Sequence, residues 1–147
     1  MNKIIWMVIV LLAGAFLPIQ AGLNSRLGKA IQSPVYASLI SFLVGVVALV
    51  LYIGVTSQQI TWSAMKAAPA YSWLGGILGA FYVTVVVLAF PKLGPAFTFG
   101  LLVLGQMFIS LFLDHFNLLV AQQQSINIWR IVGVILIVSG VVLIRKF

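Results

Sequence analysis

Long apolar stretches alternate with short polar segments along the whole chain, and five of these stretches have the length of a transmembrane helix. A helix that spans a bilayer needs about 20 predominantly apolar residues. The pattern therefore predicts an all-α integral membrane protein, a bundle of five transmembrane helices in one membrane domain covering residues 1–147. The predicted spans lie at about residues 4–23, 35–55, 70–90, 96–117 and 128–144.

Composition agrees with this interpretation. The chain of 147 residues is 63% hydrophobic and 6% charged, with a mean hydropathy of +1.24, so it has too few polar groups to cover a soluble globule. Its eight Lys and Arg residues stand singly or in pairs between the apolar stretches, which is not a nucleic-acid-binding pattern. They suit membrane boundaries, where such charges orient helices and meet anionic lipid.

The first stretch also has features of a signal peptide, since Ile19 and Ala21 stand at the spacing of a cleavage site. Its length and the spans that follow it favour a transmembrane helix. Pro18 lies inside this span and is expected to kink it or to free backbone carbonyls. Residues 26–34 are predicted to form a short polar turn. Two prolines and a glycine in residues 91–95 predict a break between the third and fourth spans.

The fourth span carries a polar stripe. Gln106, Ser110 and Asp114 recur every four residues, so a helix places them on one face. Polar groups that face lipid are costly, and the stripe is therefore expected to face other helices or a water-filled cavity. Asn117 tolerates the left-handed conformation that closes many helices, which puts Asp114 in the last turn, where the helix dipole disfavours a negative charge.

Three further polar residues are candidates for a binding site. Gln20 and Asn24 lie one turn apart just beyond Pro18, and they either line a site or mark a helix end at the interface. Tyr82 lies in the middle of the third span, where a substrate contact and a hydrogen-bonded core tyrosine are both reasonable.

An odd number of spans puts the two termini on opposite sides of the membrane. One side then carries Lys3, Lys66 and Arg130, and the other carries Arg26, Lys29, Lys92, Arg145 and Lys146. Three against five is a weak bias that marginally favours an external amino terminus. A chain so evenly charged is able to insert both ways and form an antiparallel homodimer, with the symmetry of inverted repeats in larger transporters.

The chain resembles the YdcZ-type family of five-span membrane proteins in the drug/metabolite transporter (DMT) superfamily. The similar stretches are residues 17–24, 41–45, 74–82, 91–94, 105–106 and 114–116. Asn117 departs from the glycine that the family pattern has after Asp114-His115-Phe116. The resemblance implies a DMT-like bundle in the bacterial inner membrane that transports a small molecule.

The last span is similar to the dimerising helix of the four-span small multidrug resistance proteins. Gly133 and Gly140 are seven residues apart and share a face, as a seam between two helices requires. The resemblance implies an antiparallel homodimer, or a heterodimer with a homologous subunit. In those proteins a glutamate in span one exchanges protons for cationic drugs, whereas span one here offers Gln20 and no acid.

Few residues are available for enzyme chemistry. With one carboxylate side chain, one histidine and no cysteine, the sequence predicts no catalytic site, no metal site and no cofactor. In an antiparallel dimer, Asp114 of one copy comes level with Gln20, Asn24 and Arg26 of the other. We therefore expect Gln20, Asn24, Tyr82, Gln106 and Ser110 to bind substrate, and Asp114 with Arg26 to form a gate or ion pair.

Two alternatives remain open from the sequence. In the first alternative, Asp114 forms a structural ion pair with Arg130 or Lys3, which would only fix a helix end. The chain as a whole is either a transporter or a non-transporting membrane subunit that stabilises or regulates a partner membrane protein. Water reaching Gln106 and Ser110 would distinguish the transporter.

Overall fold

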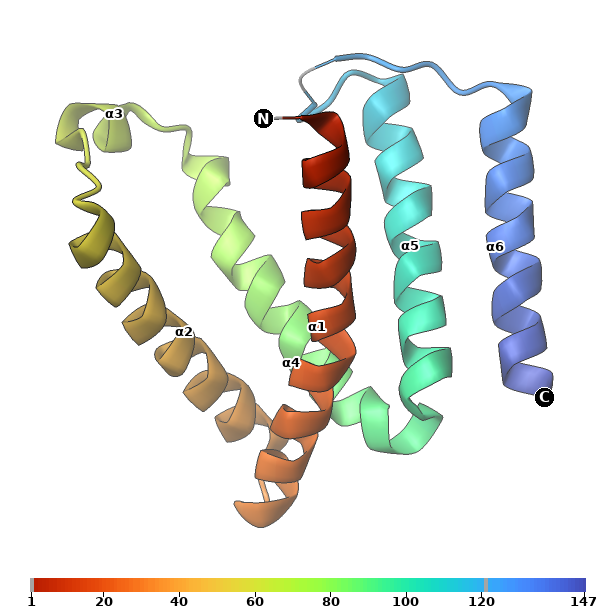
Figure 1. Cartoon of the computed structure of the whole chain (residues 1–147), viewed down its shortest axis with the longest axis horizontal. Helices are drawn as coiled ribbons and strands as arrows, with labels where there is room; N and C mark the ends of the chain where they lie inside the picture. Colours follow the sequence, from red (N-terminus) through yellow and green to blue (C-terminus); the bar gives the residue numbers. More distant parts are fainter. Residues whose placement is uncertain (1, 121) are drawn as a thin grey trace. The chain divides into compact units, whose positions relative to one another are not determined.

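The computed structural model describes residues 2–120 and 122–147, and within these residues all regular structure is helical (Figure 1). Five helical stretches are long and apolar enough to cross a membrane, which confirms the all-α, five-span prediction. The elements are α1 (Lys3–Ala30), α2 (Pro34–Thr56), α3 (Trp62–Ala67), η1 (Ala70–Trp73), α4 (Leu74–Leu93), α5 (Pro95–His115) and α6 (Ile128–Lys146). The single membrane domain stays a prediction.

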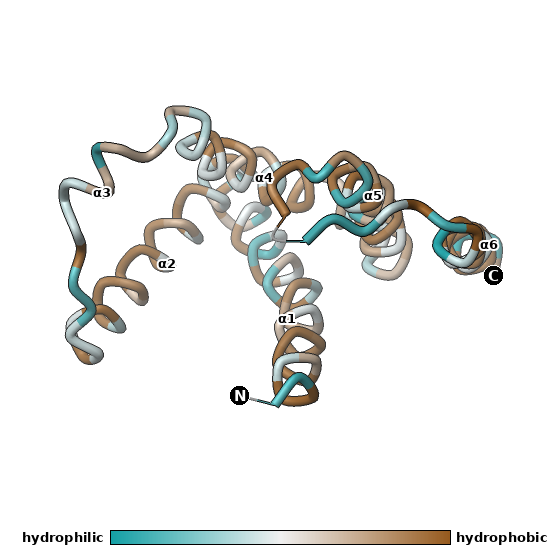
Figure 2. The backbone as a smooth tube through the Cα atoms, turned by 90° about the horizontal axis from the view of Figure 1, so that it is seen from above, coloured by the Kyte–Doolittle hydropathy of each residue, from teal (hydrophilic) through white to brown (hydrophobic). Residues whose placement is uncertain are grey.

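Most residues of the long helices are apolar, whereas polar residues gather at the helix ends and in the connections (Figure 2). The described chain divides into a first unit, Met1–Lys92, and a second unit, Leu93–Phe147. In the first unit α1 packs against α2, and in the second α5 packs against α6. At most 11% of the most apolar part of any spanning helix is buried inside the chain, so lipid or other chains must cover most of the apolar surface.

The α1–α2 connection is shorter than predicted. Helix α1 continues through Arg26 and Lys29, and only residues 31–33 form the turn. Gln32 adopts a left-handed conformation, with φ of 55°, and the Ser33 amide donates to the Gly28 carbonyl at 2.9 Å. This is the Schellman pattern, which satisfies helix carbonyls while the chain reverses. Basic residues in the last turns of a helix are stabilised by its dipole, which is why α1 continues through them.

Glycine is needed at position 28 because α1 and α2 approach closely there. A Cβ atom at Gly28 would lie 3.3 Å from the Pro34 Cα. Pro34 occupies the first turn of α2, where its missing N–H costs nothing, and the Ser33 hydroxyl accepts from the Tyr36 amide at 3.4 Å. The two spans therefore form a tight helical hairpin.

The break between the third and fourth spans falls within residues 91–95, as predicted. Helix α4 includes Pro91 and continues to Leu93, and the break is confined to Gly94, with φ of +78°, before Pro95 begins α5. Pro91 comes in the last turn, where few residues remain to be disturbed. The residue that ends the helix is therefore the glycine, because only it readily adopts a positive φ.

The end of α5 follows the prediction for Asn117. The helix ends at His115, and Asn117 has φ of 54°. The Leu118 amide donates to the Leu113 carbonyl at 2.9 Å, which completes a second Schellman pattern. The chain then returns to α6, which the Asn127 side chain caps by accepting from the Arg130 amide at 3.0 Å. Farther along the pair, a Cβ at Gly100 of α5 would lie 3.1 Å from the Val141 Cγ2 of α6.

Candidate functional site

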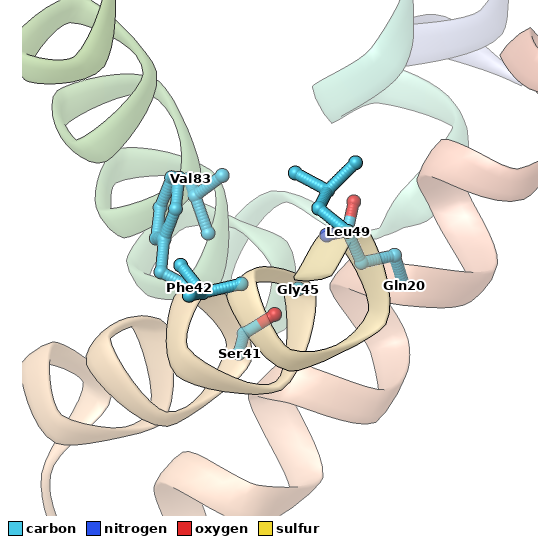
Figure 3. A pocket seen from close by; sticks show the side chains of 7 residues that line it. Gln20, Ser41, Phe42, Gly45, Leu49 and Val83 are labelled. Atoms are coloured by element: carbon cyan, nitrogen blue, oxygen red, sulfur yellow. The ribbon is translucent and has the colours of Figure 1, made fainter. Parts of the chain in front are cut away.

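The first unit contains a cavity between α1, α2 and α4, which we call the first cavity (Figure 3). Its volume is about 290 Å³, and it is open to the surroundings of the chain. Gln20 comes from α1 and Val83 from α4, with a strip of α2 between them. The lining residues are Gln20, Ser41, Phe42, Gly45, Val46, Leu49 and Val83. The wall is therefore apolar except for one amide and one hydroxyl.

Asn24 holds this wall instead of lining it. Its side-chain amide donates to the Ser41 hydroxyl at 3.1 Å, and the residue is only 7% exposed. A buried amide that already has a partner is poorly placed to exchange it for a ligand. Asn24 therefore joins α1 to α2 and orients Ser41.

Tyr82 is half-buried on α4, next to Val83, but is not among the lining residues of the first cavity. No hydrogen bond joins its hydroxyl to another residue in the described part of the chain. Helix α4 approaches α2 closely at Gly79, where a Cβ would lie 3.8 Å from the Phe42 ring. Phe42 thus connects the first cavity to α4.

The second unit contains a cavity between α5 and α6, which we call the second cavity. Its volume is about 340 Å³. The lining residues are Met107, Ser110, Leu111, Asp114, Arg130, Gly133, Val134 and Ile137. Two members of the predicted stripe, Ser110 and Asp114, therefore face it. Gln106 is exposed on the same helix, one turn earlier, and does not line this cavity.

An ion pair closes one end of the second cavity. The Arg130 Nη2 donates to the Asp114 Oδ2 at 3.1 Å, and both side chains are about a quarter exposed, at 24% and 28%. Asp114 lies at the carboxyl end of α5 and Arg130 in the first turn of α6, so each charge has the sign that its own helix dipole disfavours. Pairing them compensates both, which explains why two unfavourably placed charges occur together.

Arg130 also holds the connection between the two helices, residues 116–127. Its Nη1 donates to the Gln124 carbonyl at 2.9 Å, and its Nη2 also donates to the Gln124 side-chain oxygen. The Gln124 amide in turn donates to the Asp114 carbonyl at 3.3 Å. The ion pair that the sequence offered as an alternative is therefore present and belongs to a larger polar cluster.

Three other residues predicted to act between two copies, Arg26, Gly133 and Gly140, take no part in this polar cluster. Arg26 is exposed on α1, and its pairing with Asp114 of a second copy stays a prediction. Gly133 and Gly140 have no neighbouring atom within 4 Å of a Cβ position, in the described part of the chain. Their small faces on α6 are thus open to a partner helix, although no partner is part of the structure.

Comparison with known families identifies the family of this chain. A family model described as "Putative inner membrane exporter, YdcZ" matches residues 5–143. The chain belongs to this YdcZ family. It is accordingly a multi-pass inner-membrane protein of a transporter family, as the resemblance in the sequence implied. No curated protein and no solved structure matches the chain.

Proposed function

We propose that this YdcZ-family protein exports a small amphipathic molecule by alternating access, as an antiparallel dimer. The observation that carries the proposal is the pair of cavities in the membrane-spanning helices, each with an apolar wall and a few polar groups. Binding sites for small molecules have this character and begin at about 300 Å³. Each cavity lies near that lower limit, so walls from a second copy would enlarge it.

Three exposed polar residues support the dimer. Gln20, Gln106 and Ser110 lie on spanning helices and are largely uncovered by their own chain. Polar groups in contact with lipid are costly, and helices in membranes bury them against one another or around water. The open faces of Gly133 and Gly140 give α6 a surface on which another helix can pack closely.

Within this proposal, Gln20 contacts substrate in the first cavity and Ser110 contacts it in the second, while Tyr82 and Gln106 contact it from the adjoining surfaces of α4 and α5. Asn24 positions Ser41. Asp114 and Arg130 form a gate at the end of the second cavity. A heterodimer with a homologous subunit would use the same surfaces.

A ligand screen with matched variants tests the transport function. Compounds that raise the melting temperature of the purified protein bind its folded state. Replacing Ser110 with alanine should weaken their binding about fivefold, the equivalent of one ordinary hydrogen bond. Ser139→Ala is the matched control, because the Ser139 hydroxyl bonds the Ile135 carbonyl at 2.8 Å and lines neither cavity.

The same compounds should then cross the membrane of proteoliposomes that contain the protein. Compounds that bind at Ser110 but are never transported would contradict export and favour the non-transporting subunit. Equal weakening by Ser110→Ala and Ser139→Ala would contradict a site in the second cavity.

The antiparallel dimer has its own test, because the chain has no cysteine. Copies carrying Gln20→Cys should crosslink to copies carrying Ser110→Cys, since the level of each residue matches in inverted copies. Reporter fusions at both termini should show both orientations in the membrane. A single orientation would exclude the antiparallel homodimer and leave a heterodimer or a parallel assembly.

A further inference from the structure

Three basic residues gather at one end of the first unit. Arg26 and Lys29 lie in the last turns of α1, and Lys92 lies in the last turn of α4. The Phe90 Cζ of α4 lies 3.6 Å from the Cβ position of Gly22 on α1, so the two helices meet just before these residues. Arg26 and Lys29 follow Gly22 by four and seven residues, which puts all three on one face of α1. The basic residues of α1 therefore lie on the face that meets the end of α4.

No acidic side chain compensates this charge. Residues 1–92 contain no Asp or Glu, and the one carboxylate side chain, Asp114, pairs with Arg130 of its own unit. All three basic residues are exposed, and their side chains form no hydrogen bond or ion pair with any residue that the structure describes. The carboxyl ends of α1 and α4 supply about half a negative charge each, and the amino end of α2 supplies about half a positive one. Most of the positive charge therefore needs a counterion from outside the chain.

The surroundings of this basic cluster indicate which counterion fits. Arg26 follows the apolar residues of α1, and Lys92 follows those of α4, so the cluster lies where the chain leaves the hydrocarbon of the bilayer. Immediately before it on α1, Ile19 and Leu23 are exposed. An anionic phospholipid matches both surfaces, because its phosphate lies at the boundary and its acyl chains lie against the apolar residues. A free phosphate ion would meet the charges alone.

We propose that Arg26, Lys29 and Lys92 form a binding site for an anionic phospholipid, whose phosphate lies between the ends of α1 and α4. The planar guanidinium of Arg26 suits bidentate bonds to phosphate oxygens, and the two ammonium groups act as point charges. The bound headgroup joins α4 to the hairpin of α1 and α2. This site is separate from the proposed transport function, since none of the three residues lines the first cavity.

Native mass spectrometry of the full-length protein in detergent tests the site, because it counts bound lipids directly. Phosphatidylglycerol, which is anionic, should bind more tightly than zwitterionic phosphatidylcholine. The double variant Arg26→Gln with Lys29→Gln should weaken phosphatidylglycerol binding about 25-fold, and Lys92→Gln about fivefold, since each basic residue near anionic lipid contributes about fivefold. Measuring in detergent also removes any effect of these charges on the orientation of the chain in the membrane. Equal affinity for the two lipids in the parent protein would overturn the site.

The matched control is the double variant Lys3→Gln with Lys66→Gln. It removes the same charge from the same unit, at the opposite membrane boundary, because α1 begins at Lys3 and Lys66 lies in α3, between α2 and α4. These two lysines are also exposed, but they lie on different helices and belong to no cluster with Arg26. Binding of phosphatidylglycerol should be nearly unchanged. Equal weakening by the two double variants would show that any boundary charge suffices, and would overturn the site.

Thermal unfolding distinguishes the lipid from a free phosphate ion. A ligand that binds the folded state raises the apparent melting temperature. Phosphatidylglycerol should therefore stabilise the parent protein more than the Arg26→Gln, Lys29→Gln variant, and inorganic phosphate should not reproduce this difference. A rise with inorganic phosphate as large as that with phosphatidylglycerol would overturn the lipid as the occupant. If the double variant does not fold, Lys92→Gln on α4 provides the same comparison, and an unchanged affinity there would overturn the site between the two helices.

Discussion

The two cavities differ in how their polar groups are held. The first cavity has neutral groups, Gln20 and Ser41, and a single side-chain bond from Asn24 orients one of them. The second cavity ends in a charged pair, Asp114 and Arg130, whose guanidinium also binds the connection between α5 and α6. The polar wall of the first cavity is thus fixed by a bond between α1 and α2, whereas that of the second cavity is fixed by bonds to the loop between α5 and α6.

This difference follows from where charges can be accommodated in a membrane. Asp114 and Arg130 lie at helix ends, where the Gln124 carbonyl of the loop accepts from Arg130 and the Asp114 carboxylate accepts from the same guanidinium. In the middle of a span such partners are absent, because the backbone bonds itself, and neutral amides and hydroxyls are less costly there. A charged gate at the end of a neutral binding surface is the arrangement that these costs favour.

The largest expected effect comes from removing one half of the ion pair. Arg130→Ala leaves Asp114 uncompensated at the carboxyl end of α5, where the helix dipole disfavours it. It should lower the free energy of unfolding by about 2 to 4 kcal/mol, slightly below the cost of breaking a fully buried pair. Denaturant titration in mixed micelles measures the loss.

The control for this variant is the neutral pair Asp114→Asn with Arg130→Gln. The double variant should be more stable than Arg130→Ala, because no unpaired charge remains. Equal losses in both would show that Arg130 matters through its bonds to Gln124, and the contrast between a charged and a neutral cavity would lose its energetic basis.

An intermediate effect is expected where α5 and α6 approach most closely. Gly100→Leu would force its side chain against Val141, since even a Cβ atom lies 3.1 Å from the Val141 Cγ2. The expected loss in the free energy of unfolding is about 1 to 3 kcal/mol, typical of an overpacked contact.

Gly105→Leu, on the same helix, is the matched control, since no atom in the described chain lies within 4 Å of its Cβ position. It should leave the unfolding of the chain nearly unchanged. A similar loss in both variants would mean that the second unit is held by something other than the Gly100 contact.

The smallest effect concerns the neutral bond of the first unit. Asn24→Ala, Ser41→Ala and the double variant form a cycle whose coupling should be about 0.6 kcal/mol, the average for hydrogen bonds between transmembrane helices. Unfolding in mixed micelles provides the four free energies. If the coupling free energy of Asn24 and Ser41 exceeded that of Asp114 and Arg130, the neutral bond would stabilise the chain more than the ion pair, contrary to our expectation.

The sequence predicted the helices well because apolar length is a local property. It also predicted the left-handed Asn117, because a single residue type favours that conformation. It predicted the break after α4 within residues 91–95, where Gly94 lies, but it placed the end of α1 too early. The error at α1 arose from assigning Arg26 and Lys29 to a turn, although the last turns of a helix accept basic residues.

The site was predictable only in part. Helical periodicity put Ser110 and Asp114 on one face, and both line the second cavity. The same periodicity included Gln106, which does not line it. Arg130 as partner was one of two intrachain alternatives, since choosing between Arg130 and Lys3 requires the path of residues 116–127. The bond from Asn24 to Ser41 depends on the crossing of α1 and α2, which no local pattern contains.

The three-residue turn between α1 and α2 also bears on how the protein is made. Because only residues 31–33 separate α1 from α2, the side of the membrane on which this turn lies fixes the direction of both spans. Arg26 and Lys29 lie beside that turn, so they are on the same side of the membrane as the turn. Biogenesis would thus decide the orientation of both spans in a single event, governed by a local pair of positive charges.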